Sequence, residues 1–183
     1  MKKMGILLVL IMLMATAASV QAEVKAGSVT VTPFFGFYNF ESRELELDNS
    51  YSLGLRAGYN FTENAGVEGV FNYVKTDMNE LIPITRDDDV YMYGLSLEGL
   101  YHFFPDGKVV PFLAAGIGNL YYDSPGGHMD KLTFDYGAGL KLFLTEDVAL
   151  RADIRHVIPM NETFNDLMGT VGISFAFGGK NKC

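Results

Sequence analysis

Strict alternation of apolar and polar residues is the feature that most limits how this chain can fold. In YSLGLRAGYNF, residues 51–61, the odd positions are Tyr, Leu, Leu, Ala, Tyr and Phe, and the even positions are Ser, Gly, Arg, Gly and Asn. Successive side chains of a β-strand point to opposite faces, so a period of two predicts a strand with one apolar face and one polar face. The polar face meets either bulk water or a polar interior, and the class of protein depends on which.

The same pattern recurs along the whole chain behind its first residues, and it predicts eight strands. Glycine and β-branched residues interrupt these segments, which argues against helices. The predicted strands cover residues 28–40, 51–61, 65–76, 90–104, 109–122, 133–144, 148–158 and 167–177.

The connecting segments alternate between short and long. The short ones are 62–64, 105–108 and 145–147, and the long polar ones are 41–50, 77–89, 123–132 and 159–166. Outer-membrane barrels have short periplasmic turns, long external loops and an even number of strands. The sequence therefore predicts an all-β fold, an eight-stranded antiparallel up-and-down transmembrane β-barrel.

The N-terminus has the parts of a secretory signal peptide. Lys2 and Lys3 precede an uncharged apolar run over residues 4–18, and SVQA then places small residues at the positions that a signal peptidase reads. This run is shorter than the roughly 18 to 20 apolar residues that span a bilayer, which argues against an anchor. We expect a signal peptide over 1–22, a barrel domain over 23–179 and a short tail over 180–183.

Charge and cysteine content exclude several classes of function. The net charge of −8 argues against a nucleic-acid partner. Cys183 is the only cysteine, which excludes a disulfide framework and a thiolate metal cluster. The longest uncharged stretch behind the signal sequence, residues 109–122, is too short for a transmembrane helix. A chain of this kind can enter a membrane only as a closed barrel.

The two faces of the predicted strands differ in a way that assigns them to lumen and lipid. One face carries leucine and isoleucine, with aromatic residues such as Tyr59, Phe61, Tyr101 and Phe177 towards the strand ends, which is typical of a lipid-facing band between two membrane interfaces. The other face combines glycine with long charged side chains, which suits a crowded narrow lumen. Its charged residues are Arg56, Glu68, Glu98, Asp135, Lys141, Arg151, Asp153 and Arg155.

Four segments carry a resemblance to a known family: GLRAGYNFTENAGVEGVFNYV (54–74), VVPFLAAGIG (109–118), LRADIRHV (150–157) and TVGISFAFGG (170–179). With these in order, the chain resembles the OmpA-type eight-stranded outer-membrane barrels over its mature length. The resemblance implies a monomeric barrel in the cell outer membrane, in contact with membrane lipid and lipopolysaccharide. Many family members continue into a domain that grips peptidoglycan; this sequence stops after GGKNKC, so we expect the barrel without that anchor.

The last predicted strand fits the terminal signal by which such proteins are recognised by the barrel assembly machinery. The resemblance assigns this signal to Thr170, Gly172, Phe175 and Phe177, with six residues following Phe177. The assembly machinery is thus an expected partner.

Counting inward from the short turns predicts which lumen charges are neighbours. Arg56 is diagonal to Glu68, Asp135 to Arg155, and Lys141 to Asp153, at distances that long side chains bridge. Arg151 falls opposite Lys141, a repulsion that Glu68 or Glu98 would have to relieve. A gated polar pore and a salt-bridged plug both fit this pattern; we favour the plug because side chains fill the interior of eight-stranded barrels.

The remaining candidates for chemistry give no catalytic, cofactor-binding or metal site. The sequence has three histidines, His102, His128 and His156, and His128 is near Ser124 and Asp130. A Ser-His-acid site needs three converging groups, so an interfacial or solvated position is the better interpretation for each histidine. RDDD (86–89) lacks the spacing of a calcium loop. We predict a structural or surface-interaction protein and no cofactor. The alternatives are a narrow pore for small solutes and a lipid-modifying enzyme.

Overall fold

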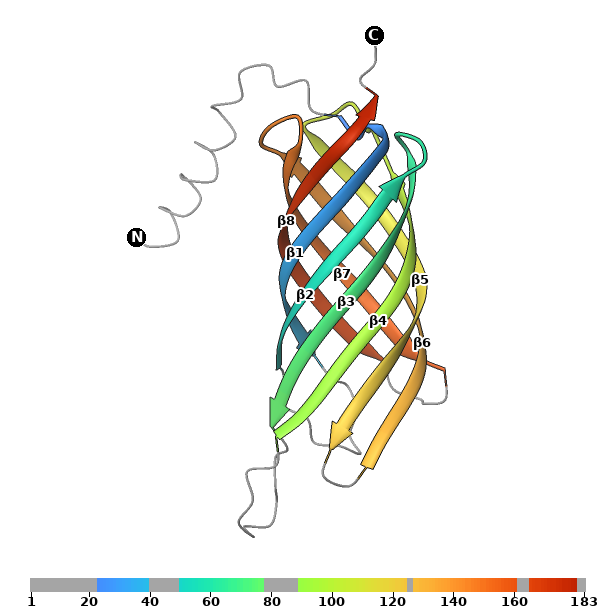
Figure 1. The fold of residues 1–183 in the computed structure, drawn as a ribbon, viewed down its shortest axis with the longest axis vertical. Helices are drawn as coiled ribbons and strands as arrows, with labels where there is room; N and C mark the ends of the chain where they lie inside the picture. Colours follow the sequence, from blue (N-terminus) through green and yellow to red (C-terminus); the bar gives the residue numbers. More distant parts are fainter. Residues whose placement is uncertain (1–22, 40–49, 78–88, 125–126, 161–164, 181–183) are drawn as a thin grey trace, which may run out of the picture.

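The chain forms a closed barrel in which each strand is antiparallel to its neighbours. The structure is a computed structural model, and it describes residues 23–39, 50–77, 89–124, 127–160 and 165–180. Strands follow one another around the barrel in chain order, and the first strand closes against the last (Figure 1). The strands are β1 (Ala26–Asn39), β2 (Ser50–Asn60), β3 (Ala65–Asp77), β4 (Asp89–His102), β5 (Val109–Ser124), β6 (Gly127–Phe143), β7 (Val148–Pro159) and β8 (Asp166–Lys180).

The short turns lie together at one end of the barrel. The turns β2–β3, β4–β5 and β6–β7 are at the top of Figure 1, with the start of β1 and the end of β8. Each turn is closed by backbone hydrogen bonds, such as those from Thr62 N to Ala65 O (3.1 Å) and from Leu144 N to Val148 O (2.8 Å). The predicted sorting of short turns to one rim is confirmed. Among the described residues, no helix is long and apolar enough to cross a membrane.

The strand prediction differs from the structure most between β5 and β6. Residues 123–132 were expected to form a long polar loop, but the two strands stay paired up to Ser124 and Gly127. The hairpin reaches further than the neighbouring strands, because the β6–β7 pairing ends at Thr133 and Pro159. β8 also runs on to Lys180, past the predicted end at residue 177. The signal peptide, the tail after Lys180 and most of the other predicted long loops lie outside the described residues.

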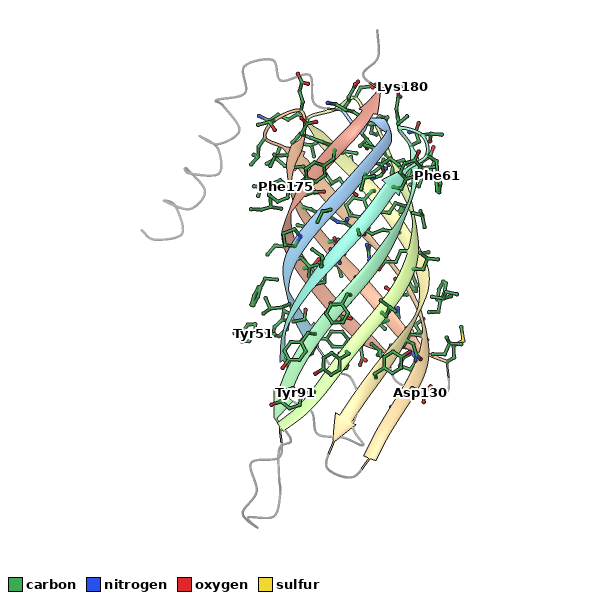
Figure 2. All side chains as sticks on the ribbon, in the orientation of Figure 1. Tyr51, Phe61, Tyr91, Asp130, Phe175 and Lys180 are labelled. Carbon is green, nitrogen blue, oxygen red and sulfur yellow. The ribbon has the colours of Figure 1, made fainter. Side chains whose placement is uncertain are left out.

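Burial alternates along the strands as the sequence pattern predicts. The inward side chains are buried, and the outward ones are mostly large, apolar and exposed, such as Leu53, Leu95 and Ile154. Aromatic residues stand near both rims of this outer wall: Figure 2 labels Phe61 and Phe175 near the end with the short turns, and Tyr51 and Tyr91 near the opposite end.

Three apolar clusters divide the interior of the barrel. One lies next to the short turns and consists of Val24, Val110, Phe143 and Ala149. Another consists of Leu100, Phe112 and Ala114. The third lies towards the opposite end and consists of Tyr38, Val74, Met92, Leu120, Val157 and Met168. The charged side chains are in the interior between the first and third clusters.

Candidate functional site: the charged lumen

All the charged residues assigned to the lumen from the sequence lie inside the barrel. Their side chains come from the inward positions of β2, β3, β4, β6 and β7, and each residue is at most 5% exposed. Glycines beside them provide the necessary space: a Cβ on Gly139 would overlap the Phe112 ring and Asp153 Cβ. Long side chains packed against bare backbone therefore fill most of the interior.

Four of these residues form a central ionic layer: Arg56 (β2), Glu68 (β3), Arg151 and Asp153 (β7). Arg151 donates two hydrogen bonds to Glu68, at 2.7 and 2.9 Å, and its Nε donates to Asp153 at 2.9 Å. Arg56 donates two to Asp153, at 3.1 and 3.0 Å. Glu68 thereby offsets the repulsion between Arg151 and Lys141, which face each other in the register.

Neutral groups also contact the central ionic layer. The Thr170 hydroxyl accepts from Arg56 at 3.1 Å and donates to Asp153 at 3.0 Å. The guanidinium of Arg56 lies 4.2 Å from the centre of the Phe34 ring, and that of Arg151 lies 4.6 Å from the centre of the Phe112 ring. Such cation–π contacts and bidentate pairs hold the layer in one geometry.

A second layer, of Glu98, Asp135 and Arg155, is less completely paired. Arg155 Nη2 lies 2.8 Å from Glu98 Oε2, and 3.8 Å from Asp153. Asp135 is diagonal to Arg155 in the register, as predicted. However, Glu98 is the closest carboxylate to Arg155, and Asp135 Oδ1 has no hydrogen-bond partner among the described residues. A cavity of about 30 Å³ lies beside these three side chains.

The expected bridge between Lys141 and Asp153 is replaced by a different contact. The two residues are diagonal in the register, but Lys141 Nζ lies 2.9 Å from His102 Nε2. Asp153 instead binds Arg56 and Arg151, whose guanidinium groups reach it from two sides.

His102 corrects the sequence interpretation. It was expected to be interfacial or solvated, but it is fully buried in the lumen on β4. Its even position, shared with the inward-facing Glu98 and Leu100, was the signal that could have placed it there.

The fold and its outward apolar wall agree with a comparison against protein families. Residues 8–180 match the family described as outer membrane protein beta-barrel domain. The chain belongs to this family. The comparison with curated protein sequences gave no match.

Solved structures of outer-membrane barrels share this fold. The N-terminal barrel of Pseudomonas aeruginosa OprF is 21% identical with a TM-score of 0.60, covering 84% of this chain and 99% of that one. Yersinia pestis Ail is 20% identical with a TM-score of 0.56, covering 83% and 99%. Neisserial surface protein A is 15% identical with a TM-score of 0.66, covering 82% and 99%. At these identities the likeness concerns the fold, which is that of transmembrane barrels.

The other predicted residues of this family member are placed as follows. Thr170 and Gly172 of the assembly signal face inward on β8, and Phe175 and Phe177 face outward. His156 lies on β7 with its Nδ1 2.8 Å from the Tyr136 hydroxyl. The side chains of Ser124 and His128, and residues 86–88, lie outside the described residues. Within the described part of the chain, no group of three or more His, Cys, Asp or Glu could hold a metal ion.

Proposed function

We propose that this barrel is a structural and surface-display protein of the outer membrane, with a lumen that does not conduct. The observation that carries the proposal is the central ionic layer, in which Arg56, Glu68, Arg151 and Asp153 are paired with one another across the interior. A solute would have to separate these buried pairs, and removing a partner from such a pair typically costs about 3 to 5 kcal/mol.

The apolar clusters support a closed lumen at two further levels. The cluster near the short turns includes Val24, which is held by a hydrogen bond from its N to Pro105 O (2.9 Å). The cluster at the opposite end contains six buried apolar side chains. A hydrated solute entering from either side meets an apolar layer before it reaches the charges, and apolar constrictions exclude water.

The outer surface of the barrel supports the other parts of the proposed role, which are contact with lipid and with the assembly machinery. Its apolar outer wall would contact membrane lipid, with lipopolysaccharide in the outer leaflet, and a single barrel would suffice because closure leaves no free strand edge. Phe175 and Phe177 project from β8 where the barrel assembly machinery would meet them. The segments at the end opposite the short turns would face the outside.

Conductance in planar bilayers tests the closed lumen. We expect the purified wild-type barrel to give no steady openings. The double variant Glu68→Ala, Arg151→Ala removes a matched pair of opposite charges from the central ionic layer, and we expect it to give brief openings, because the apolar clusters on both sides remain. Each sample must first show the altered gel migration of an unheated closed barrel. Steady openings of the folded wild type would overturn the proposal.

A narrow pore for small solutes is the second candidate, because one part of the lumen is not filled. The cavity beside Asp135 and Arg155 is lined by polar atoms that have no hydrogen-bond partner among the described residues. If the pore function is correct, wild-type openings should occur, and Asp135→Asn should change their preference for cations over anions.

A further inference from the structure

A groove crosses the outer wall of the barrel, away from the charged lumen. It is a cavity of about 750 Å³ and opens on the surface that the family places in lipid. Outward residues on five adjacent strands, β5 to β8 and then β1, line it.

The register explains the course of the groove. Cross-strand partners form two parallel rows that run from strand to strand. The first row is Leu113, Ala138, Ile154, Gly169 and Phe37. The second row is Pro111, Leu140, Ala152, Val171 and Phe35. At about 4.8 Å between neighbouring strands, four steps give a groove roughly 19 Å long.

Small residues make the groove deep and large ones border it. Ala138, Ala152 and Gly169 leave the backbone bare near its middle, and a Cβ on Gly169 would meet nothing within 4 Å. Outward leucine, isoleucine, valine and phenylalanine side chains stand around them, each at least 37% exposed. In a membrane, where apolar surfaces gain little by leaving lipid, small residues that permit close approach decide which partner packs well.

We propose that this groove is a specific binding site for one acyl chain of a membrane phospholipid. Its first end lies by Pro111 and Phe103, next to the rim with the short turns. Because barrel strands are tilted, rows perpendicular to them rise along the barrel from that end to Phe35 and Phe37. The groove is thus open to the lipid interface at the end by Phe103, and its outward side chains are apolar.

The curvature of the wall favours a flexible chain over a second barrel. Five adjacent strands of eight span half of the circumference. A rigid neighbouring barrel is convex and touches only a small part of such a path. A hydrocarbon chain can bend along all of it, and gains dispersion contacts over the full length.

Native mass spectrometry of the detergent-purified barrel, titrated with palmitoyl-oleoyl phosphatidylethanolamine, tests this site. We expect the wild type to retain one phospholipid. Ala152→Phe fills the groove, so it should need about tenfold more phospholipid for the same occupancy. Gly169→Leu fills a neighbouring point and should act in the same direction.

Ala57→Phe is the matched control, because Ala57 is an exposed outward alanine on β2, outside the groove. It should bind like the wild type, and all variants should keep the gel migration of a closed barrel. Equal retention by Ala57→Phe and Ala152→Phe, or no retained phospholipid in the wild type, would overturn the proposal. A dimer lost only in Ala152→Phe would overturn it in favour of a contact between two copies. Conductance is not involved, so failure here is separate from failure of the closed lumen.

Discussion

The two charged layers of the lumen have similar composition and very different completeness. In the central ionic layer, two arginines and two carboxylates share short hydrogen bonds and Thr170 adds two more. Only one atom of these four charged residues, Arg56 Nε, has no hydrogen-bond partner among the described residues. In the layer of Glu98, Asp135 and Arg155, one ion pair of 2.8 Å coexists with polar atoms that lack partners.

This difference shows that burying opposite charges together does not by itself pair all their polar atoms. Arg56 donates two hydrogen bonds to Asp153, and Arg151 donates two to Glu68 and a third, from its Nε, to Asp153. Arg155 reaches Glu98, and Asp135 is left beside a cavity. A cavity of about 30 Å³ with several polar groups in its wall is large enough for a water molecule. Stability should therefore depend more on the first layer than on the second.

Arg151→Ala should have the largest effect. It leaves Glu68 as a buried carboxylate without its two strong donors, so the free energy of unfolding should fall by about 3 to 5 kcal/mol. Urea unfolding in phospholipid vesicles, followed by gel migration, measures the change. Arg151→Lys keeps the charge but loses the planar fork and should fall between the wild type and the alanine variant. A loss no greater than that of Arg155→Ala would remove the contrast between the layers.

Leu140→Arg extends the comparison to the other side of the wall. Leu140 is half exposed on the outer surface of β6, next in sequence to buried Lys141. A charge there has no partner in lipid and should cost about 2 to 4 kcal/mol if the site lies near the midplane. The same vesicle assay measures it, with Leu140→Ala as the control for lost packing. If arginine and alanine behaved alike, this side of the strand would not face lipid.

Two double-mutant cycles resolve the second layer itself. Arg155 combined with Glu98 should give a coupling energy of about 1 to 3 kcal/mol, because their ion pair is short and buried. Arg155 combined with Asp135 should give a smaller value. Equal couplings in vesicle unfolding would mean that Arg155 divides its contacts between both carboxylates.

Lys25→Met, at the rim with the short turns, should have the smallest effect. Lys25 Nζ donates to Asp147 at 3.0 Å and lies 3.6 Å from Glu146, but both carboxylates are more than half exposed. Exposed pairs contribute about 0 to 1 kcal/mol.

The pH dependence of the Lys25 contact has a definite sign. The hydrogen bond to Asp147 raises the pKa of Lys25 above 10.5 despite its burial. Its stabilising contribution is therefore fully present below pH 10.5 and is lost as the pH rises through the folded-state value. The difference between wild type and Lys25→Met should shrink in that alkaline range; a constant difference would point to packing by the lysine stem.

Much of the fold was predictable because successive residues of a strand face opposite sides, so the sequence alternates between apolar and polar residues. Arg56 and Leu55 were assigned to opposite sides of the wall on that basis, and short turns then fixed the register of their neighbours. The extent of the β5–β6 hairpin was missed because Pro125, Gly126 and Gly127 indicate a loop, whereas the pairing continues up to Ser124 and Gly127.

The contacts inside the lumen were less predictable than the positions. Diagonal counting relates residues on adjacent strands, and Arg56 with Glu68 is such a pair, at 3.7 Å. Arg151 with Glu68 and Arg155 with Glu98 instead join side chains across the interior, between strands that are not neighbours. Such contacts depend on barrel radius and on how far each side chain extends, and neither is recorded in local sequence.

Closure of the barrel also imposes an order on its folding. β1 pairs with β8, and Val29, for example, lies opposite Phe177. This seam between the first and last strands can form only when nearly the whole chain is present. Contacts between residues so distant in sequence are slow to form, since a long loop must close before they stabilise anything. Until then both terminal strands carry unpaired edges and apolar side chains, a state prone to aggregation. We therefore expect substitutions in the seam to affect folding as well as the stability of the finished barrel.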